Sequence, residues 1–243
     1  MSLTEIHLRP AVSQDLPSIA EVAAQSMLDD ELFAFLCPRR REFYSDYRQS
    51  FLRRLRAKLI SPGWVVIVAV GNSGTRSVDA DSWPILGYCV WERIGDTADE
   101  STKRWKETSN DSWWTRVQEL FGNVSEHFVT RLYPDRSVDA SRLARYNALT
   151  VECFPYNDFP EIWFLSTLAV HPAYQRQGIG RRLIEWGLKQ ATWDGTPVGL
   201  EASAKGTHLY QSLGFQIVNE VPLVEGVALT AMLWRPSFRV AHP

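Results

Sequence analysis

The chain has few cysteines, no long hydrophobic run and no excess of charge of one sign. Its three cysteines, Cys37, Cys89 and Cys153, form no CxxC pair, which disfavours both a disulfide framework and a thiolate zinc site. We therefore expect no metal and a reducing compartment. The longest purely apolar run, Trp64 to Val70, is far shorter than the roughly 20 residues that span a bilayer. The sequence thus predicts no association with membranes.

The N-terminal segment also lacks the unbroken apolar core of a signal peptide, because Glu5, His7, Arg9 and Asp15 interrupt it. We expect a soluble, cytoplasmic protein. The 26 Lys and Arg nearly balance the 28 Asp and Glu, which leaves a net charge of -2. This balance argues against a dedicated nucleic-acid-binding protein, which would need a large positive excess.

What is present is the composition of a folded protein. The 243 residues are 45% hydrophobic and 22% charged, with ten tryptophans. Such proportions exclude wholesale disorder, and the length suits one or two domains. We predict one domain over residues 1–243, with an insertion at about 96–160 and a ligand-binding core at about 162–218.

Alternation, apolar periodicity and turn residues predict the secondary structure. Strands are expected at Glu5–Arg9, Trp64–Val70, Pro84–Ile94, Ile162–Val170 and Pro197–Leu200, and a terminal hairpin at Gln216–Val224 and Val227–Trp234. Helices are expected from Leu16 to Met27, from Phe43 to Leu59, from Gly178 to near Asp194 and from Thr207 to Leu213. This order indicates an α/β fold.

Two features of the helical segments bear on later results. Ser13 or Asp15 is the expected cap of the first helix, with Pro17 in its first turn. In the second helix the basic residues fall on faces other than the apolar one. They could indicate an acidic substrate or a nuclear signal, but we interpret them as a solvated face. They are Arg48, Arg53, Arg56 and Lys58.

The insertion contains Trp105, Trp113 and Trp114, and its spacing from residue 113 onward is helical. It either packs as a cap over the sheet or lines an acceptor pocket.

The most informative segment follows the strand that ends at Val170. A short turn with glycines at 178 and 180 leads directly into a helix. Glycine lets backbone approach a ligand closely, and the first N–H groups of a helix have no intrahelical acceptors. The segment therefore predicts a phosphate site at the helix N-terminus. A dinucleotide fingerprint would need a third glycine at Leu183, and a P-loop would need Lys after Gly180, so neither motif is present.

Two motifs resemble the GNAT family of N-acetyltransferases. Gln175 to Gly180 (QRQGIG) matches the family signature [RQ]xxGxG, although Arg181 replaces the small residue that often follows. Downstream, Leu200 to Phe215 is similar to the strand and helix of the family that end in LYxxLGF. The order of the two motifs is also that of the family.

The resemblance implies a fold and a cosubstrate. The fold would be a mixed, mostly antiparallel sheet that splays open beside its fourth strand, flanked by helices. Backbone at Leu168 and Val170 would hold the pantetheine of acetyl-CoA. The pyrophosphate would lie on the turn, whose contributing residues are Gln175, Arg176, Gln177, Gly178, Ile179, Gly180 and Arg181. Ser203 stands where many members carry a cofactor-binding Asn. Family members are often dimers, so a homodimer is possible.

The resemblance also implies roles in acetyl transfer to an amine. Transfer needs a neutral nucleophile, an N–H near the thioester oxygen and a proton for the departing thiolate. The Val170 N–H would polarise the thioester, and Tyr210 would act as general acid. We rank Glu201 first as general base; a water relay would serve equally. Other candidates for the base are His171, Glu161 and Asp158, while His208 is interpreted as a solvated helix residue.

Three functions remain open at this point. The first is acetylation of a primary amine on a small molecule. The second is acetylation of a protein N-terminus or lysine, which would favour an open groove. The third is a non-catalytic module that binds acyl-CoA, which Ser203 and the lack of an obvious base leave open.

Overall fold

The computed structural model describes residues 5–72, 83–98, 101–103, 135–224 and 226–236. The described strands are β1 (Glu5–Pro10), β2 (Trp64–Asn72), β3 (Ile85–Ile94), β4 (Ile162–Val170), β5 (Val198–Ala202), β6 (Gln216–Val224) and β7 (Val227–Trp234). The described α-helices are α1 (Leu16–Ser26), α2 (Glu31–Leu36), α3 (Tyr44–Ile60), α6 (Ala140–Cys153), α7 (Ile179–Asp194) and α8 (Ala204–Gln211). None of the helices in these ranges is long and apolar enough to cross a membrane.

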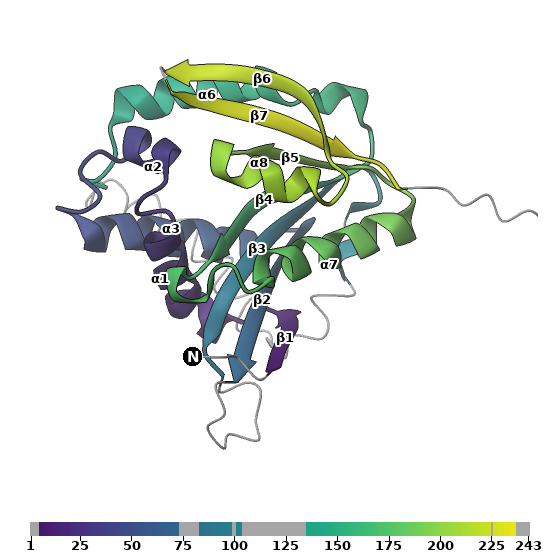
Figure 1. Ribbon diagram of the computed structural model, residues 1–243, viewed down its shortest axis with the longest axis horizontal. Coiled ribbons are helices and arrows are strands. Elements are labelled where there is room, and N and C mark those ends of the chain that lie inside the picture. Colours follow the sequence, from purple (N-terminus) through teal and green to yellow (C-terminus); the bar gives the residue numbers. More distant parts are fainter. Residues whose placement is uncertain (1–4, 73–82, 99–100, 104–134, 225, 237–243) are drawn as a thin grey trace, which may run out of the picture.

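The strands form one seven-stranded sheet in the order β1-β2-β3-β4-β5-β7-β6. All neighbours are antiparallel except β4 and β5, which are parallel. The predicted mixed, mostly antiparallel sheet is therefore confirmed, as are the predicted terminal hairpin and the antiparallel pairing of the second and third strands. Figure 1 shows β1 to β4 in the lower part of the molecule and β5, β7 and β6 in the upper part.

The sheet opens between β4 and β5. These strands pair only from Trp163 with Val198 to Leu165 with Leu200, so residues 166–170 of β4 have no partner on that side. On its other side β4 pairs with β3, where Val90 lies opposite Thr167 but Trp91 lies opposite Leu165. Ser166 is thus the extra residue of a β-bulge, which bends the strand. The splay predicted beside the fourth strand is confirmed (Figure 1).

Helices cover both faces of the sheet, and alternate strand residues enter different cores. On one face α7 and α8 pack over a core that includes Trp91, Trp163, Leu183, Leu200 and Tyr210. On the other face α1, α2, α3 and α6 cover two cores. One contains Ile19, Tyr47, Phe51, Val68 and Val90, and the other contains Cys153, Phe154, Ile162, Phe164 and Ala231. The two faces of the sheet at the opening are therefore covered by different helices and lined by different core residues.

Two glycines fix how closely helices approach the sheet. A Cβ on Gly187 of α7 would lie 2.1 Å from the Trp91 ring, and a Cβ on Gly199 of β5 would lie 2.5 Å from the Phe154 ring. Real Cβ atoms essentially never come so close, so both positions require glycine. Gly187 holds α7, and the turn that precedes it, against β3.

The helices match the prediction in type but not in every detail. α1 and α3 are confirmed, but Asp15 does not cap α1 with its side chain. Its carboxylate accepts instead from the Val12 N–H at 2.8 Å and from the Arg9 guanidinium at 2.7 and 2.9 Å, which joins α1 to β1. α2 was not predicted, because it is only six residues long. The predicted helix after residue 113 lies outside the described residues, and α6 follows it.

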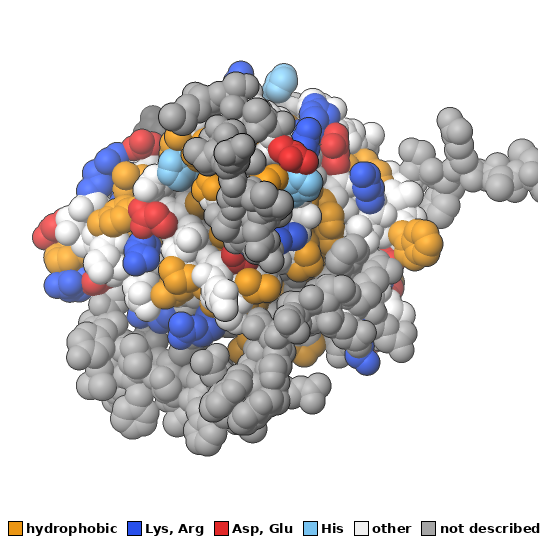
Figure 2. All heavy atoms as spheres, turned by 90° about the horizontal axis from the view of Figure 1, so that it is seen from below, with side chains coloured by type: hydrophobic (Ala, Val, Ile, Leu, Met, Phe, Trp, Pro, Cys, Tyr) orange, Lys and Arg blue, Asp and Glu red, His pale blue; other side chains and the backbone are white. Residues whose placement is uncertain are grey.

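Acidic and basic side chains are interspersed on the described part of the face seen in Figure 2. No field of one sign dominates that part, as the net charge of -2 leads us to expect.

Candidate functional site

The turn between β4 and α7 presents unpaired backbone N–H groups. Arg176 and Gly178 both have left-handed backbone, with φ of 64° and 79°. The first bond of the helix runs from the Arg182 N–H to the Gly178 carbonyl at 3.1 Å. The N–H groups of residues 176–181 donate to no acceptor within the described part of the chain. Together with the positive end of the 16-residue helix α7, these donors form an anion site.

Gly180 directs this turn toward the unpaired end of β4. A Cβ on Gly180 would lie 3.5 Å from Leu209 Cδ2 and 3.8 Å from both Leu168 Cδ2 and Val170 Cγ2. A larger side chain at position 180 would therefore project over the strand residues expected to hold pantetheine. The glycine keeps this approach open.

The amides of Leu168 and Val170 point away from β3 and into the opening. The His171 N–H donates to Leu86 O on the β3 side at 2.8 Å. Because successive amides of a strand point to opposite sides, those of Leu168 and Val170 point toward β5. Gln175 confirms this direction, since its Nε2 donates to Val170 O at 3.0 Å. The sequence predicted that Gln175 aids the pyrophosphate; the structure places it on this carbonyl.

The other polar side chains of the turn lie around the anion site and do not cover it. Arg176 and Gln177 are exposed. The Arg181 guanidinium donates to Ser212 Oγ at 2.8 Å and lies 3.8 Å from Glu185, so it points along the surface toward the end of α8. Ser203 is the N-cap residue of α8, but its hydroxyl makes no capping hydrogen bond.

Tyr210 lies on the inner face of α8, on the same side of the sheet as α7. Its ring packs 5.8 Å from that of Phe215, and only 8% of the residue is exposed. Burial raises the pKa of its phenol, so the hydroxyl stays protonated at neutral pH. Within the described residues this hydroxyl has no hydrogen-bond partner. Its proton is therefore not held by another group of the described residues.

Glu201 lies on the opposite face of β5. Leu200 and Ala202 enter the core under α7, so the intervening Glu201 points toward α6. Burial raises the pKa of its carboxyl to about 7. No ion pair or hydrogen bond to Glu201 is present in the part of the chain that the structure describes. A carboxylate that titrates near neutrality without a partner suits a general base.

The same environment connects Glu201 to two tyrosines. Burial, followed by the charge of Glu201, raises the pKa of Tyr146 of α6 to about 12. The pKa of Tyr156, in a short 3-10 turn (Tyr156–Asp158), is raised by the same two causes. The Tyr156 ring packs 5.1 Å from that of Phe164. Glu201 is thus surrounded by aromatic side chains.

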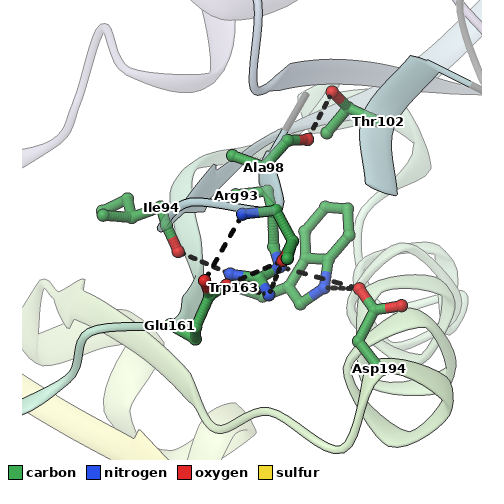
Figure 3. Close-up of polar contacts among 8 residues, drawn as sticks. Arg93, Ile94, Ala98, Thr102, Glu161, Trp163 and Asp194 are labelled. Carbon is green, nitrogen blue, oxygen red and sulfur yellow. Dashed lines mark hydrogen bonds and ion pairs between the residues drawn. The ribbon is translucent and has the colours of Figure 1, made fainter. Parts of the chain in front are cut away.

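Glu161 is unsuited to the role of base. Figure 3 shows its carboxylate against the buried Arg93 guanidinium, with which it forms an ion pair, and the Thr97 hydroxyl donates to it at 2.9 Å. Burial alone would raise the pKa of Glu161, but the hydrogen bonds from Thr97 and Arg93 outweigh it and hold that pKa low. Arg93 also lies 3.6 Å from Asp194, which accepts from Trp163 Nε1 at 2.8 Å. This network anchors the start of β4.

The other two candidate bases have structural surroundings. His171 is the N-cap residue of a short 3-10 turn (Pro172–Tyr174), and its Nδ1 accepts from the Ala173 N–H at 3.2 Å. Asp158 is exposed at the end of the turn that contains Tyr156. Of the four carboxylates and imidazoles considered from sequence, Glu201 alone combines burial, a raised pKa and a place beside the opening. In the described ranges no group of three or more His, Cys, Asp or Glu is arranged to hold a metal.

Comparison with known proteins identifies the family. The model of the acetyltransferase (GNAT) domain matches residues 141–217, which include the turn at 175–180 and the segment around Tyr210. An acetyltransferase of Stachybotrys chartarum is 27% identical over 217 residues, which cover 88% of this chain and 82% of that protein. Residues 141–217 of this chain are a GNAT acetyltransferase domain. This GNAT chain is therefore an acetyltransferase enzyme, and the non-catalytic alternative is set aside.

Solved structures agree on the GNAT fold. A structure described as histone acetyltransferase HPA2 and related acetyltransferase from Corynebacterium glutamicum superposes with a TM-score of 0.57, at 18% identity and over 98% of this chain and 99% of that one. Arylalkylamine N-acetyltransferase 2 from Aedes aegypti gives 0.50 at 13% identity, over 96% of this chain and 99% of that one.

The structure also reveals residues that the sequence did not single out for the GNAT site. Lys58 was interpreted as solvated, which is wrong: it is half-buried, and its Nζ donates to Ser166 Oγ at 2.7 Å. Glu92 of β3 is partly buried nearby, and burial raises the pKa of its carboxyl. The bond between Lys58 and Ser166 joins residues 108 positions apart, so no local sequence pattern predicts it.

Replacement of Gly180 tests the turn. Gly180→Val places methyl groups over Leu168 and Val170, and we expect the affinity for acetyl-CoA, measured by calorimetric titration, to fall by about tenfold or more. Lys189→Val, at an exposed position of the same helix, is the matched control and should bind normally. Equal affinity of the two variants would contradict the placement of the cosubstrate.

Replacement of Glu201 tests the base. The wild-type kcat/KM should rise with pH through about 7, because only the ionised carboxylate accepts a proton. In Glu201→Gln this rise near pH 7 should be absent, and kcat/KM should be at least about a hundredfold lower than in the wild type. Glu220→Gln, on the exposed part of β6, should change neither. A limb near pH 7 that persists in Glu201→Gln would assign the base to another group.

Proposed function

We propose that this GNAT enzyme transfers the acetyl group of acetyl-CoA to a primary amine of a small molecule, by direct attack in a ternary complex. The observation that carries the proposal is the opening between β4 and β5. It has Tyr210 on one face, Glu201 on the other, and a turn of free amides at its end. A proton donor and a proton acceptor are thereby held on opposite sides of one gap.

Acetyl-CoA fits this arrangement through backbone rather than through charged side chains. The free amides of Gln177 to Gly180 would hold the pyrophosphate, and the amides of Leu168 and Val170 would hold pantetheine. The pantetheine arm would run from the turn back along β4 and pass Val170 before Leu168. This direction makes the Leu168 N–H a second candidate, beside that of Val170, for polarising the thioester oxygen.

The chemistry then needs no covalent enzyme intermediate. Glu201, ionised near neutral pH, accepts a proton from the acceptor ammonium or from the nitrogen during attack. The nitrogen forms a bond with the thioester carbon, and the carbon–sulfur bond breaks. Tyr210, whose raised pKa keeps it protonated, donates its proton to the departing thiolate. The acid and the base serve different atoms of one reaction.

The surroundings of Glu201 favour a small acceptor. The carboxyl is half-buried, with Tyr146, Tyr156 and Phe164 on the same side of the sheet. A small amine can be desolvated among these rings, whereas a folded protein surface would have to reach past them. Aromatic faces also attract an ammonium group before it is deprotonated.

A kinetic experiment tests the proposal. Release of the CoA thiol is measured over a panel of small primary amines and a panel of lysine peptides. We expect turnover with a small amine and converging lines in double-reciprocal plots, as a ternary complex requires. Parallel lines with an acetylated enzyme in the mass spectrum would contradict direct attack. Turnover confined to the peptides would contradict the small acceptor.

Tyr210→Phe tests the proton donor. Loss of one hydroxyl leaves the packing against Phe215, so the fold and the affinity for acetyl-CoA should be retained. We expect kcat to fall by about tenfold or more, because the thiolate must leave without a proton. Tyr174→Phe removes a hydroxyl beside His171 and serves as the control. An unchanged kcat in Tyr210→Phe would exclude this role.

A further inference from the structure

Lys58 is a cation held at the bulge of β4. It lies in the last turn of α3, and its Nζ donates to Ser166 Oγ at 2.7 Å and lies 4.4 Å from the centroid of the Trp64 ring. Within the described residues Lys58 forms no ion pair, and Ser166 is the only hydrogen-bond acceptor of its three N–H donors. A half-buried ammonium group without an ion-pair partner is costly.

The charges around Lys58 do not neutralise it. Burial and, to a smaller extent, the charge of Arg54 lower its pKa to about 8, while Glu92 acts in the opposite direction. The Glu92 carboxyl is partly buried, and burial raises its pKa while the charge of Lys58 acts in the opposite direction. Two cations, Lys58 and Arg54, thus act at the bulge against one carboxylate, and the site would accept a further carboxylate or a similar anion.

The opposite wall of the opening carries the opposite charge. Leu165 and Leu200 are the last paired residues of β4 and β5, so Ser166 and Glu201 are the first residues beyond the pairing on the two strands. Ser166 points to α3, as its bond with Lys58 shows, and Glu201 points to α6. Both helices cover the face opposite α7 and α8. Cation and carboxylate thus flank the mouth of the opening on one face.

We propose that the acceptor of this enzyme carries a carboxylate as well as its primary amine, with the carboxylate bound by Lys58 and the amine beside Glu201. This inference rests on the proposed function and names its substrate class, an amino carboxylate. An acceptor with only an amine would add no negative charge beside Lys58 and Arg54. A polyamine would place a second positive charge against Lys58 and Arg54, which is unfavourable.

A series of matched acceptors tests the inference. Each amino carboxylate, with one to four carbons between its two groups, is compared with its own amide, which keeps the shape and removes the charge. The ratio of the two kcat/KM values is measured for the wild type, Lys58→Met, Lys58→Arg and Arg56→Met. Arg56 is an exposed cation on the same helix. The difference in amine pKa between acid and amide is the same for every variant, so changes in the ratio report the side chain.

We expect the wild type to favour the carboxylate by about tenfold or more. Lys58→Met should abolish this preference while turnover of the amide is retained, and Lys58→Arg and Arg56→Met should keep it. A second readout is binding without turnover: calorimetry, with CoA present, should show the N-acetylated acid bound more tightly than the N-acetylated amide by the wild type only, and equally by Lys58→Met.

Other results overturn the inference in distinguishable ways. If amides and acids are acetylated equally, or if Lys58→Met lowers both alike, Lys58 only joins α3 to β4, and the proposed function stands. If acetyl-CoA binds but no acid, amide or simple amine is acetylated, the proposed function fails and the inference falls with it.

Discussion

The early end of the pairing between β4 and β5 is the constraint on which this structure depends. Three residue pairs hold the strands together, and the bulge at Ser166 then turns β4 away. Unpaired strand amides are normally avoided in proteins, because they attract other strands or must be solvated. Here they lie inside the molecule between two helical layers, where a ligand with amide groups of its own can pair with them. The opening is an incomplete sheet, which we propose the cosubstrate completes.

The surrounding packing keeps this opening in place. The Arg93 network with Glu161 and Asp194 fixes the start of β4, and the absence of a side chain on Gly187 seats α7 against Trp91 (Figure 3). The turn of free amides is consequently held at the other end of β4. Because successive residues of β5 face opposite sides, Tyr210 lies under one face of this strand and Glu201 projects from the other. The proposed acid and the proposed base are close in sequence, but the sheet places them on opposite faces.

The sequence predicts those parts of the fold that local patterns encode. β-branched runs gave the strands, and the glycines at 178 and 180 marked the anion turn, because left-handed backbone and free helix amides need those residues at that spacing. Long-range contacts were not predictable. Lys58 follows the spacing of solvated residues on α3, yet it is buried against Ser166. Glu161 and Glu201 cannot be told apart in the sequence, because each is a single glutamate. In the structure Glu161 is paired with Arg93, whereas Glu201 has no partner among the described residues. This difference distinguishes a structural carboxylate from a candidate base.

Hydrogen exchange at individual backbone amides, with and without acetyl-CoA, tests the central claim most directly. The account predicts that acetyl-CoA slows exchange at Leu168, Val170 and the amides of residues 176–181, while the amides of β6 and β7 keep their rates. Binding that leaves Leu168 and Val170 unchanged, or that protects a different strand edge, would contradict it. In that case the opening between β4 and β5 is not where the cosubstrate pairs.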